Sequence, residues 1–369
     1  MTIEVRPVRS RRDRRAFRDL PSRLHHGHPA FIPTLDVTLA QLLDRRRNPL
    51  WRQAEGCEWV AWNDGRPAGR IGACLDRALL ARNPGCGAVG LFDAPEDAEI
   101  SAALFDAALA WLRSRGASGA RGPLNYTIHD TAGVLVEGFD TPPTIDTTWN
   151  PHYYDALWRA AGFETAQEMI GAAGQLVIDG PERAHRVADL AKQRGVSVRP
   201  LDMAHFRDDV ARLCEVYNRA WEANWGHVPI SPELFAYKAK DLKSVLDPDL
   251  VRVAELDGEI VGFMLGLPDL NVAIRRCRGR LLPFGWWHLL RARKAGGRAR
   301  VVALGVVPGR RIRGVDALIL SDSAKAIKDH YAWAEASWVL ADNRAMVNGL
   351  ALYGLHPYKR WRMYERALP

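Results

Sequence analysis

The chain has 369 residues, of which 47% are hydrophobic and 25% are charged. This composition is typical of a soluble globular protein that is long enough for two domains. The formal net charge of +8 favours an anionic partner, which could be a nucleic acid, a phosphorylated cofactor or a membrane surface. Five scattered cysteines without CxxC spacing argue against a disulfide framework or a zinc site and favour a reducing cytosol.

The N-terminal stretch MTIEVRPVRSRRDRR lacks the apolar core of a signal peptide. No window of the sequence approaches the 18 apolar residues of a membrane-spanning helix. We therefore expect a cytoplasmic protein, and a peripheral position at the inner membrane stays open.

Two stretches of the chain recur at one fixed offset. EVRPV at 4–8 recurs as SVRPL at 197–201, and VAWNDGRPAG at 60–69 recurs as VAELDGEIVG at 253–262, each time 193 residues later. Matches in the same order at one offset indicate an internal duplication.

Both copies contain the same order of expected elements. A short strand comes first, polar helices follow, and then Asp64-Gly65 or Asp257-Gly258 predicts a tight hairpin between two strands. A further strand leads into an amphipathic helix, which is followed by a strand and by a last helix from about Asn343 to Tyr353 in the second copy. This order predicts a mixed α/β sheet with helices packed against its faces.

We expect three parts along the chain. An N-terminal domain would occupy 1–178, a polar linker helix that ends at Gly195 would occupy 179–195, and a C-terminal domain would occupy 196–369.

The two copies differ in the loop that follows their penultimate strands. Aligning Pro95 with Pro308 sets the acidic APEDAE against the basic VPGRRIRG. A helix N-terminus presents unpaired N–H groups and about half a positive charge, so it binds phosphate readily. Gly309 and Gly314 allow close approach, and the arginines within 310–313 add counter-charge. Only the second copy is expected to hold an anion, and the alternative is a solvated basic turn.

This setting resembles the GNAT acyltransferase superfamily: a DG hairpin, a strand, an R-x-x-G loop, an amphipathic helix, another strand, the dipeptide Asp-Asn and a short helix that ends in Gly. The resemblance covers 196–366 well and 1–175 as a weaker copy, so it implies a tandem GNAT fold. The superfamily signature Q/R-x-x-G-x-G/A binds the pyrophosphate of coenzyme A. Here it reads Arg311, Gly314 and Asp316, with a carboxylate in place of the final small residue.

The resemblance also implies the site of the co-substrate. Backbone from Leu304 to Val306 would pair with the pantetheine arm, and Asn343 would touch the thiol end. The first copy would be a scaffold that has lost its cofactor, and no metal is expected. The residues that we expect to bind acyl-CoA are Leu304, Val306, Arg310, Arg311, Arg313, Gly314, Val315 and Asn343.

Acyl transfer to an amine needs a group that takes up the amine proton and a donor that protonates the departing thiolate. Many relatives carry a tyrosine three residues before the closing Gly of the last helix, and that place is Leu350 here. Tyr358 and Tyr353 lie nearby, and we take Tyr358 as the candidate acid. Glu335 is the first candidate base, because a carboxylate within the apolar strand AWAEASWVL is costly unless it is functional or salt-bridged. Glu255 is the second candidate.

Aromatic residues mark two candidate acceptor regions. Trp221 and Trp225 are four apart, on one face of an expected helix, where these enzymes form the acceptor wall; core packing is the alternative. In the first copy the irregular stretch 122–154 carries Asn125 and Tyr126, and such loops on a rigid scaffold often touch ligand.

A basic and apolar insertion precedes the phosphate loop of the second copy. From Asn271 through Val315 there is no acidic residue, whereas Arg and Lys number twelve. Its centre, LLPFGWWHLL, is too short to span a bilayer. With Trp286, Trp287 and basic flanks, the segment 275–300 suits an interfacial contact with anionic lipid. Grouped apolar residues argue against nucleic acid, and an extended hairpin buried in the domain interface is the alternative.

The phrases GVLVEGFDTPP, NPHYYDAL and EASWVLADN are similar to a narrower bacterial tandem-GNAT group that is associated with ceramide synthesis, the N-acylation of a sphingoid base by acyl-CoA. Our first hypothesis is therefore an acyl-CoA-dependent N-acyltransferase that acts on a lipid amine at the cytosolic membrane face. The second is a small-molecule or protein N-acetyltransferase that uses acetyl-CoA. The third is a non-catalytic protein that binds a lipid or a partner, which Asp316 and the missing tyrosine favour.

Overall fold

The computed structural model describes residues 2–177, 180–308 and 314–369. Its backbone contacts divide the chain into two compact units. The first unit comprises Met1–Glu168, Cys277–Leu281 and Lys359–Pro369, and the second comprises Met169–Arg276 and Leu282–Tyr358. The units follow contacts rather than sequence order, because the end of the second sequence copy is counted with the first unit. The expected domains 1–178 and 196–369, which follow the sequence repeat, therefore stay a prediction.

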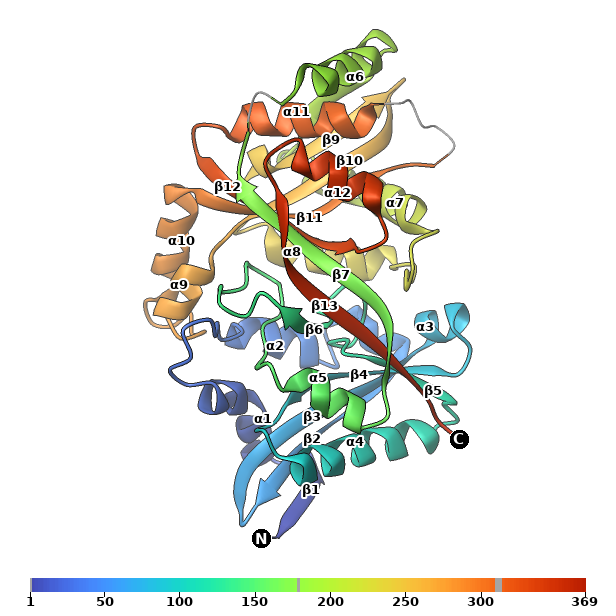
Figure 1. Ribbon diagram of the computed structural model, residues 1–369, viewed down its shortest axis with the longest axis vertical. Helices are drawn as coiled ribbons and strands as arrows, with labels where there is room; N and C mark the ends of the chain where they lie inside the picture. The colour runs from blue at the N-terminus through green and yellow to red at the C-terminus, as the bar shows by residue number, and fades with distance from the viewer. Residues whose placement is uncertain (1, 178–179, 309–313) are drawn as a thin grey trace. The chain divides into compact units, whose positions relative to one another are not determined.

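The first unit is built on an α/β sheet in the strand order β1-β2-β3-β4-β5-β13, with β6 also paired to β13 (Figure 1). The strands β7 and β13 each continue into the second unit. The elements up to β7 are β1 (Ile3–Pro7), α1 (Arg11–Leu24), α2 (Asp36–Leu43), a 3-10 turn (Pro49–Arg52), β2 (Ala54–Asn63), β3 (Arg66–Asp76), α3 (Arg77–Arg82), β4 (Cys86–Asp93), α4 (Ala98–Arg113), β5 (Gly119–Gly122), β6 (Val134–Glu137), α5 (Tyr154–Ala160) and β7 (Glu164–Gln175).

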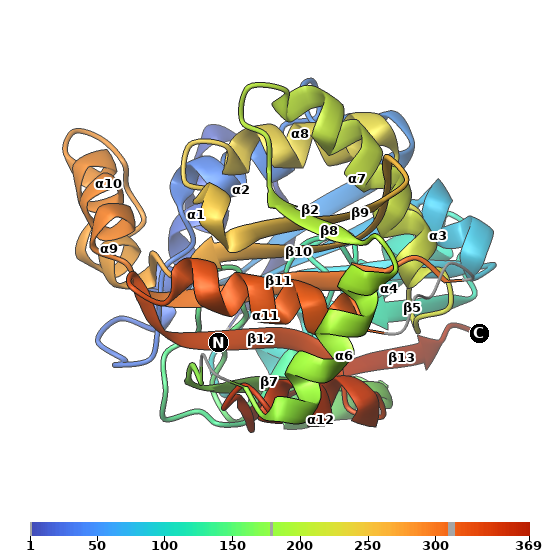
Figure 2. The ribbon, with the colours of Figure 1, turned by 90° about the horizontal axis from the view of Figure 1, so that it is seen from above.

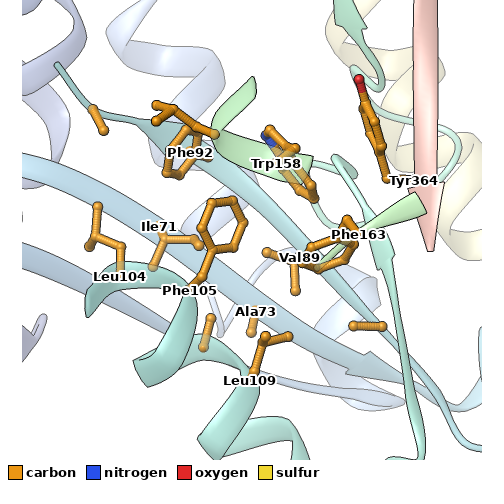
Figure 3. Packing of buried hydrophobic residues seen from close by; sticks show 14 of the residues in the cluster. Ile71, Ala73, Val89, Phe92, Leu104, Phe105, Leu109, Trp158, Phe163 and Tyr364 are labelled. Atoms are coloured by element: carbon orange, nitrogen blue, oxygen red, sulfur yellow. The ribbon is translucent and has the colours of Figure 1, made fainter. Parts of the chain in front are cut away.

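The core of the first unit forms where α4 packs on the sheet. Apolar residues recur along α4 at helical spacing, so they share one face, and that face is buried. Figure 3 shows Phe105 of α4 between Phe92 and Trp158, with ring centroids 4.8 Å and 5.0 Å away. Aromatic side chains that bury this much apolar surface stabilise the unit strongly.

The second unit has a mixed sheet in the order β7-β12-β11-β10-β9-β8. The β11–β12 pair is parallel, and the β7–β12, β10–β11, β9–β10 and β8–β9 pairs are antiparallel. The elements after β7 are α6 (Glu182–Gln193), β8 (Ser197–Pro200), α7 (Phe206–Trp221), α8 (Pro232–Leu242), a 3-10 turn (Pro248–Leu250), β9 (Val251–Leu256), β10 (Glu259–Pro268), α9 (Asn271–Arg276), α10 (Gly285–Ala295), β11 (Gly297–Val306), α11 (Val315–Ile327), β12 (Tyr331–Leu340), α12 (Arg344–Ala351) and β13 (His356–Ala367).

Helices cover both faces of the second sheet, as the order of elements predicted. Figure 2 shows α11 and α6 on one side and α7 and α8 on the other. The α11 side packs on Met264, Leu304 and neighbouring residues, and the α7 side packs on Phe263 and Val253. The expected linker helix is α6, and it packs along α11.

Both hairpin predictions are confirmed. β2 and β3 join at Asp64-Gly65, and β9 and β10 join at Asp257-Gly258. All four residues have positive φ, between 47° and 79°, as a tight turn matched to the twist of its strands requires.

Candidate active site

The two parallel strands of the second unit separate part-way along their length. The β11–β12 ladder runs from Gly297 opposite Tyr331 to Val301 opposite Ala336. Beyond it, β11 stays paired with β10, and β12 stays paired with β7. Within the described residues, the facing edges 302–306 and 337–340 are thus paired with no strand. We call this opening the fork, and its unpaired backbone groups can hydrogen-bond an extended ligand.

The backbone of β11 turns particular amides toward the fork. Just past the strand, Val307 donates its N–H to the carbonyl of Val261, on the β10 side, at 2.9 Å. Because donor direction alternates along a strand, the amides of Val306 and Leu304 point to the β12 side. These are the amides that the sequence predicted to pair with the pantetheine arm.

The first unit contains a corresponding fork, which its own chain fills. β4 and β5 are paired over three residues. Beyond them, Leu124 donates its N–H to the Val89 carbonyl at 2.8 Å, and Asn125 Oδ1 accepts from the Leu91 N–H at 2.7 Å. By the alignment of the two loops, Leu91 corresponds to Leu304. Asn125, which we expected to touch substrate, accepts this hydrogen bond from β4 within the first unit.

Tyr126 lies in the interior of the first unit, with 1% of its surface exposed. Its hydroxyl donates a hydrogen bond to Glu58, and its ring lies 5.1 Å from that of Trp51. Asn125 and Tyr126 are thus both held by hydrogen bonds to other residues of the first unit.

The helices that follow the two forks also begin differently. Asp97 caps α4, because its Oδ1 accepts from the N–H groups of Glu99 and Ile100 at 2.9 Å and 3.0 Å. α11 begins after Gly314, and among the described residues no side chain caps this end. The first-turn amides of α11 are thus the ones suited to an anion.

Gly314 has a structural reason to be glycine. Its φ is +96°, and a Cβ at this position would lie 2.2 Å from the carbonyl oxygen of Val187 in α6. Val315, the first residue of α11, is buried in the core beneath that helix. Three of the expected phosphate-binding residues, Arg310, Arg311 and Arg313, lie outside the described residues.

The structure brings two of the candidate catalytic residues into contact. Glu335, in the middle of β12, is fully buried, and its Oε2 accepts a hydrogen bond from the hydroxyl of Tyr358. Its Oε1 accepts from Ser337 Oγ at 2.6 Å. Burial, together with the Glu335 carboxylate, raises the pKa of Tyr358 well above its ordinary value. The phenol therefore keeps its proton at physiological pH and is a proton donor.

This pair faces the α7 side of the sheet, beside the fork. Ala334 and Ala336 pack with Val301, and Val301 also packs in the cluster beneath α11. Because successive side chains of a strand point to opposite faces, Glu335 and Ser337 point the other way. The arrangement sets a proton donor and a carboxylate next to the edge where an extended ligand would lie.

No family model matches the sequence. The bacterial ceramide synthase of Caulobacter vibrioides (strain NA1000 / CB15N) is 35% identical over an alignment of 375 residues that covers 99% of this chain and 98% of that protein. Protein YghO of Escherichia coli (strain K12) is 33% identical over an alignment of 373 residues that covers 99% of this chain and 95% of that protein. The chain belongs to the bacterial ceramide synthase family.

Solved structures show the fold of this family member. A tandem GNAT protein from the clavulanic acid biosynthesis pathway matches with a TM-score of 0.60 and 14% identity, over 100% of this chain and 99% of that one. A GCN5-related N-acetyltransferase from Sphaerobacter thermophilus matches with a TM-score of 0.54 and 15% identity, over 99% and 96%. The protein therefore has a tandem GNAT fold, and its full-length similarity to a ceramide synthase supports an N-acyltransferase.

Trp221 and Trp225 do not share a helical face in this family member. α7 ends at Trp221, so Trp225 lies in the following turn and the expectation of one continuous helix was wrong. Trp221 lies against β11, because a Cβ added to Gly305 would be 2.3 Å from its ring. The ring centroids of Trp221 and Phe263 are 5.8 Å apart. Trp221 thus forms part of the wall on the α7 side, next to the fork.

Two other predicted site residues have structural partners. Glu255, on β9, accepts from Arg199 at 3.0 Å and from Arg212 at 3.2 Å, so it belongs to an arginine network and not to the Glu335–Tyr358 pair. Asn343 is the N-cap of α12, where its side chain accepts from the Met346 N–H at 3.1 Å.

The basic insertion forms two helices, α9 and α10, and this observation corrects the alternative of an extended hairpin. We call residues 271–295 the arm; its helices α9 and α10 lie to one side of the second sheet (Figure 2). Trp286 and Trp287 are 46% and 56% exposed, and their neighbours Leu282 and Phe284 are 81% and 73% exposed. Side chains of this size are seldom so exposed unless they meet a partner.

Among the described residues there is no group of three or more His, Cys, Asp or Glu side chains that could hold a metal ion. None of the helices in that part of the chain is long and apolar enough to cross a membrane.

Sequence reasoning missed Ser337 and Arg300, which both lie beside Glu335. Ser337 is two residues from Glu335 on β12, so the two side chains share a face. Arg300 is directly opposite Glu335 in the parallel ladder. The alternation of polar residues in the strand could have identified Ser337, whereas Arg300 required the register.

Proposed function

We propose that this N-acyltransferase moves a long acyl group from acyl-CoA to the amine of a membrane lipid, as a ceramide synthase does. Two observations support the proposal: full-length similarity to a protein named bacterial ceramide synthase, and the exposed apolar arm beside the GNAT fold. The second observation carries it, because an enzyme for soluble amines has no need of such a surface.

The donor would bind in the second unit alone. Within the described residues no strand pairs with the facing edges of its fork, and the amides of Leu304 and Val306 point toward it. The start of α11, which no side chain of the described residues caps, suits the diphosphate of the carrier, and the arginines within 310–313 would add counter-charge. In the first unit, Asn125 and the Asp97 cap oppose binding at both corresponding places. We therefore expect one acyl-CoA per chain.

The chemistry would use Tyr358 as the group at the reacting atoms and Glu335 as the proton acceptor behind it. As the amine nitrogen attacks the thioester carbonyl carbon, its proton passes to the Tyr358 hydroxyl, which gives its own proton to Glu335. The C–S bond then breaks, and the thiolate takes up a proton as the transfer runs in reverse. The products are an amide and free coenzyme A, and both side chains return to their starting state.

The acceptor would come from an anionic membrane surface that the arm contacts. Six large apolar side chains of the arm are more than 40% exposed: Val272, Leu282, Phe284, Trp286, Trp287 and Leu290. Basic residues surround them, and the segment has no acidic residue. Each basic residue near an anionic bilayer adds about 1 kcal/mol of attraction, and Trp side chains favour the interface. We expect no nucleic acid as a partner.

Two assays with purified protein test the proposal. The first measures acyl transfer to a long-chain sphingoid base from acyl-CoAs of several chain lengths. The second measures sedimentation with vesicles of phosphatidylglycerol or of phosphatidylcholine alone. We expect transfer from long acyl-CoAs and sedimentation with the anionic vesicles. The double variant Trp286→Ala/Trp287→Ala should lose the sedimentation, whereas Leu352→Ala, a matched control at another exposed position, should keep it. Turnover with acetyl-CoA and a soluble amine, and with no long acyl-CoA, would instead assign a small-molecule acetyltransferase.

A further inference from the structure

Two buried residues beside the fork, Arg300 and Ser337, form a chain of hydrogen bonds that ends at Glu335. Arg300 is 2% exposed and Ser337 is 3% exposed. Arg300 Nε donates to Ser337 Oγ at 3.1 Å, and Ser337 Oγ donates to Glu335 Oε1 at 2.6 Å. A guanidinium buried this deeply is costly unless it is fully paired, so its presence here needs a reason.

The direction of this chain is fixed by chemistry. Arg300 has only donors and keeps its charge at any working pH. Because Ser337 Oγ accepts a hydrogen bond from Arg300, its own O–H must point elsewhere. It donates a hydrogen bond to Glu335 Oε1. Oε1 is thus held as an acceptor, whereas Oε2 faces the hydroxyl of Tyr358.

Arg300 also joins the two strands where they separate. Its Nη2 donates to the backbone carbonyl of Ser337 at 2.9 Å. Ser337 follows Ala336, the last residue of β12 that is paired with β11. The side chain therefore takes over from the backbone ladder at the point where the fork begins, and it fixes that end of β12.

We propose that Arg300 and Ser337 are positioning residues, which hold Glu335 so that Oε2 exchanges protons through Tyr358, and which fix the width of the fork at its closed end. This inference rests on the proposed function, in which Glu335 takes up the proton of the amine. It adds a reason for two buried polar residues that the acyl transfer itself does not use.

Two further charged groups, Arg298 and Asp269, lie near the Glu335–Tyr358 pair. Arg298 lowers the pKa of Tyr358, whereas Asp269 raises it. Arg298 Nε lies 3.6 Å from Asp269 Oδ2. Arg298 also lies over the ring of Trp333, 3.7 Å from its centroid. Neither residue takes part in the Arg300–Ser337–Glu335 chain, so variants of Ser337 leave that pair in place.

Ser337→Ala tests the inference through the pH dependence of kcat. A hydrogen bond donated to a carboxylate favours its charged form. Its loss should move the acid limb of the kcat profile upward by about one pH unit, so that the rate below that limb falls about tenfold. Ser337→Thr keeps the hydroxyl and should restore the profile. Arg300→Lys has a single donor nitrogen in place of Nε and Nη2, which bond the Ser337 hydroxyl and the Ser337 carbonyl. This variant should both shift the acid limb and raise the KM for acyl-CoA.

Matched controls separate positioning from stability. Ser323→Ala removes another serine that is 3% exposed, whose hydroxyl donates to the Ile319 carbonyl. Arg252→Lys changes another buried arginine, which is paired with Asp322 at 2.9 Å. Both controls should lower Tm without moving the limb.

The outcomes also distinguish this inference from the proposed function. An unmoved acid limb in Ser337→Ala, with Glu335→Gln inactive, would overturn the positioning role and leave the acyl transfer intact. A wild-type protein that acylates no amine would overturn the proposed function itself. A fully active Glu335→Gln would overturn the proton route on which the positioning role depends.

Discussion

The hydroxyl of Tyr358 donates a hydrogen bond to the carboxylate of Glu335, which is 23 residues earlier in the chain. The strand β12 holds the carboxylate in the interior, and the first residues of β13 bring the phenol to it. The pair thus joins a buried carboxylate to a less buried phenol that covers it, next to the fork of the second unit.

Replacing Tyr358 by Phe removes the hydroxyl and little else. We expect kcat to fall by about 10²-fold or more, the usual contribution of a positioned acid or base, with little change in the KM for acyl-CoA. Steady-state kinetics at saturating acyl-CoA measure it. Tyr331→Phe is the matched control, because Tyr331 also donates to a carboxylate, that of Asp247 at 2.8 Å. Equal losses in both variants would count against a role for Tyr358 in transfer.

Gly314→Ala should weaken acyl-CoA binding. The added Cβ would meet the Val187 carbonyl at 2.2 Å in a backbone with φ of +96°, so the start of α11 must move. A residue forced into this conformation costs about 1–3 kcal/mol, and we expect the Kd for acyl-CoA to rise at least fivefold by calorimetry. Gly349→Ala, where nothing lies within 4 Å of an added Cβ, should bind normally. Normal binding by both variants would mean that this helix end does not hold the carrier.

Asn125→Ala should destabilise the first unit without affecting catalysis. The Leu91 N–H would lose its acceptor, and an unpaired polar group in the interior costs about 1–3 kcal/mol. Urea unfolding followed by circular dichroism gives the free-energy change, and the KM for acyl-CoA should be unchanged. A large rise in this KM with no loss of stability would instead make Asn125 part of the binding site.

The His25–Asp93–Arg70 cluster of the first unit predicts a pH-dependent stability. Burial alone would raise the pKa of Asp93, but Arg70 at 2.7 Å and His25 at 3.2 Å outweigh it, so the pKa lies below its ordinary value. Such a group stabilises the fold above its unfolded pKa, near 3.9, and this contribution is lost as the pH falls through the lower folded pKa.

Asp93→Asn should therefore cost about 3 kcal/mol at pH 7, the usual loss when a buried ion pair is broken. The difference from the wild type should shrink below pH 4. Thermal or urea unfolding from pH 3 to pH 7 measures both values. A difference that stays constant down to pH 3 would contradict the assignment.

Local patterns predicted the hairpins, the order of elements and the fold, because each depends on residues that are close in sequence. The DG dipeptides fix a turn through their own backbone preferences, and the apolar spacing of α4 and α11 fixes a helix face. The sequence also identified Glu335 and Tyr358 as candidates, since a carboxylate in an apolar strand is costly without a partner.

Features that depend on register and on distant packing could not be predicted. Arg300 faces Glu335 only through the alignment of two parallel strands, and no local signal gives that alignment. The irregular loop made Asn125 a candidate ligand contact, and no local signal indicates that this loop folds back onto β4. The helical face expected for Trp221 and Trp225 failed because α7 ends at Trp221, and no glycine or proline marks that end in the sequence.

Hydrogen exchange with and without a non-hydrolysable long-chain acyl-CoA tests the central claim, the binding of the carrier in the fork of the second unit, most directly. Mass spectrometry of short peptides can follow the amides of Leu304 and Val306 and, in the same sample, that of Leu91. We predict slower exchange at the first two on addition of the ligand, and no change at Leu91, which Asn125 already holds. Unchanged exchange across 302–306, or protection at Leu91 instead, would contradict it.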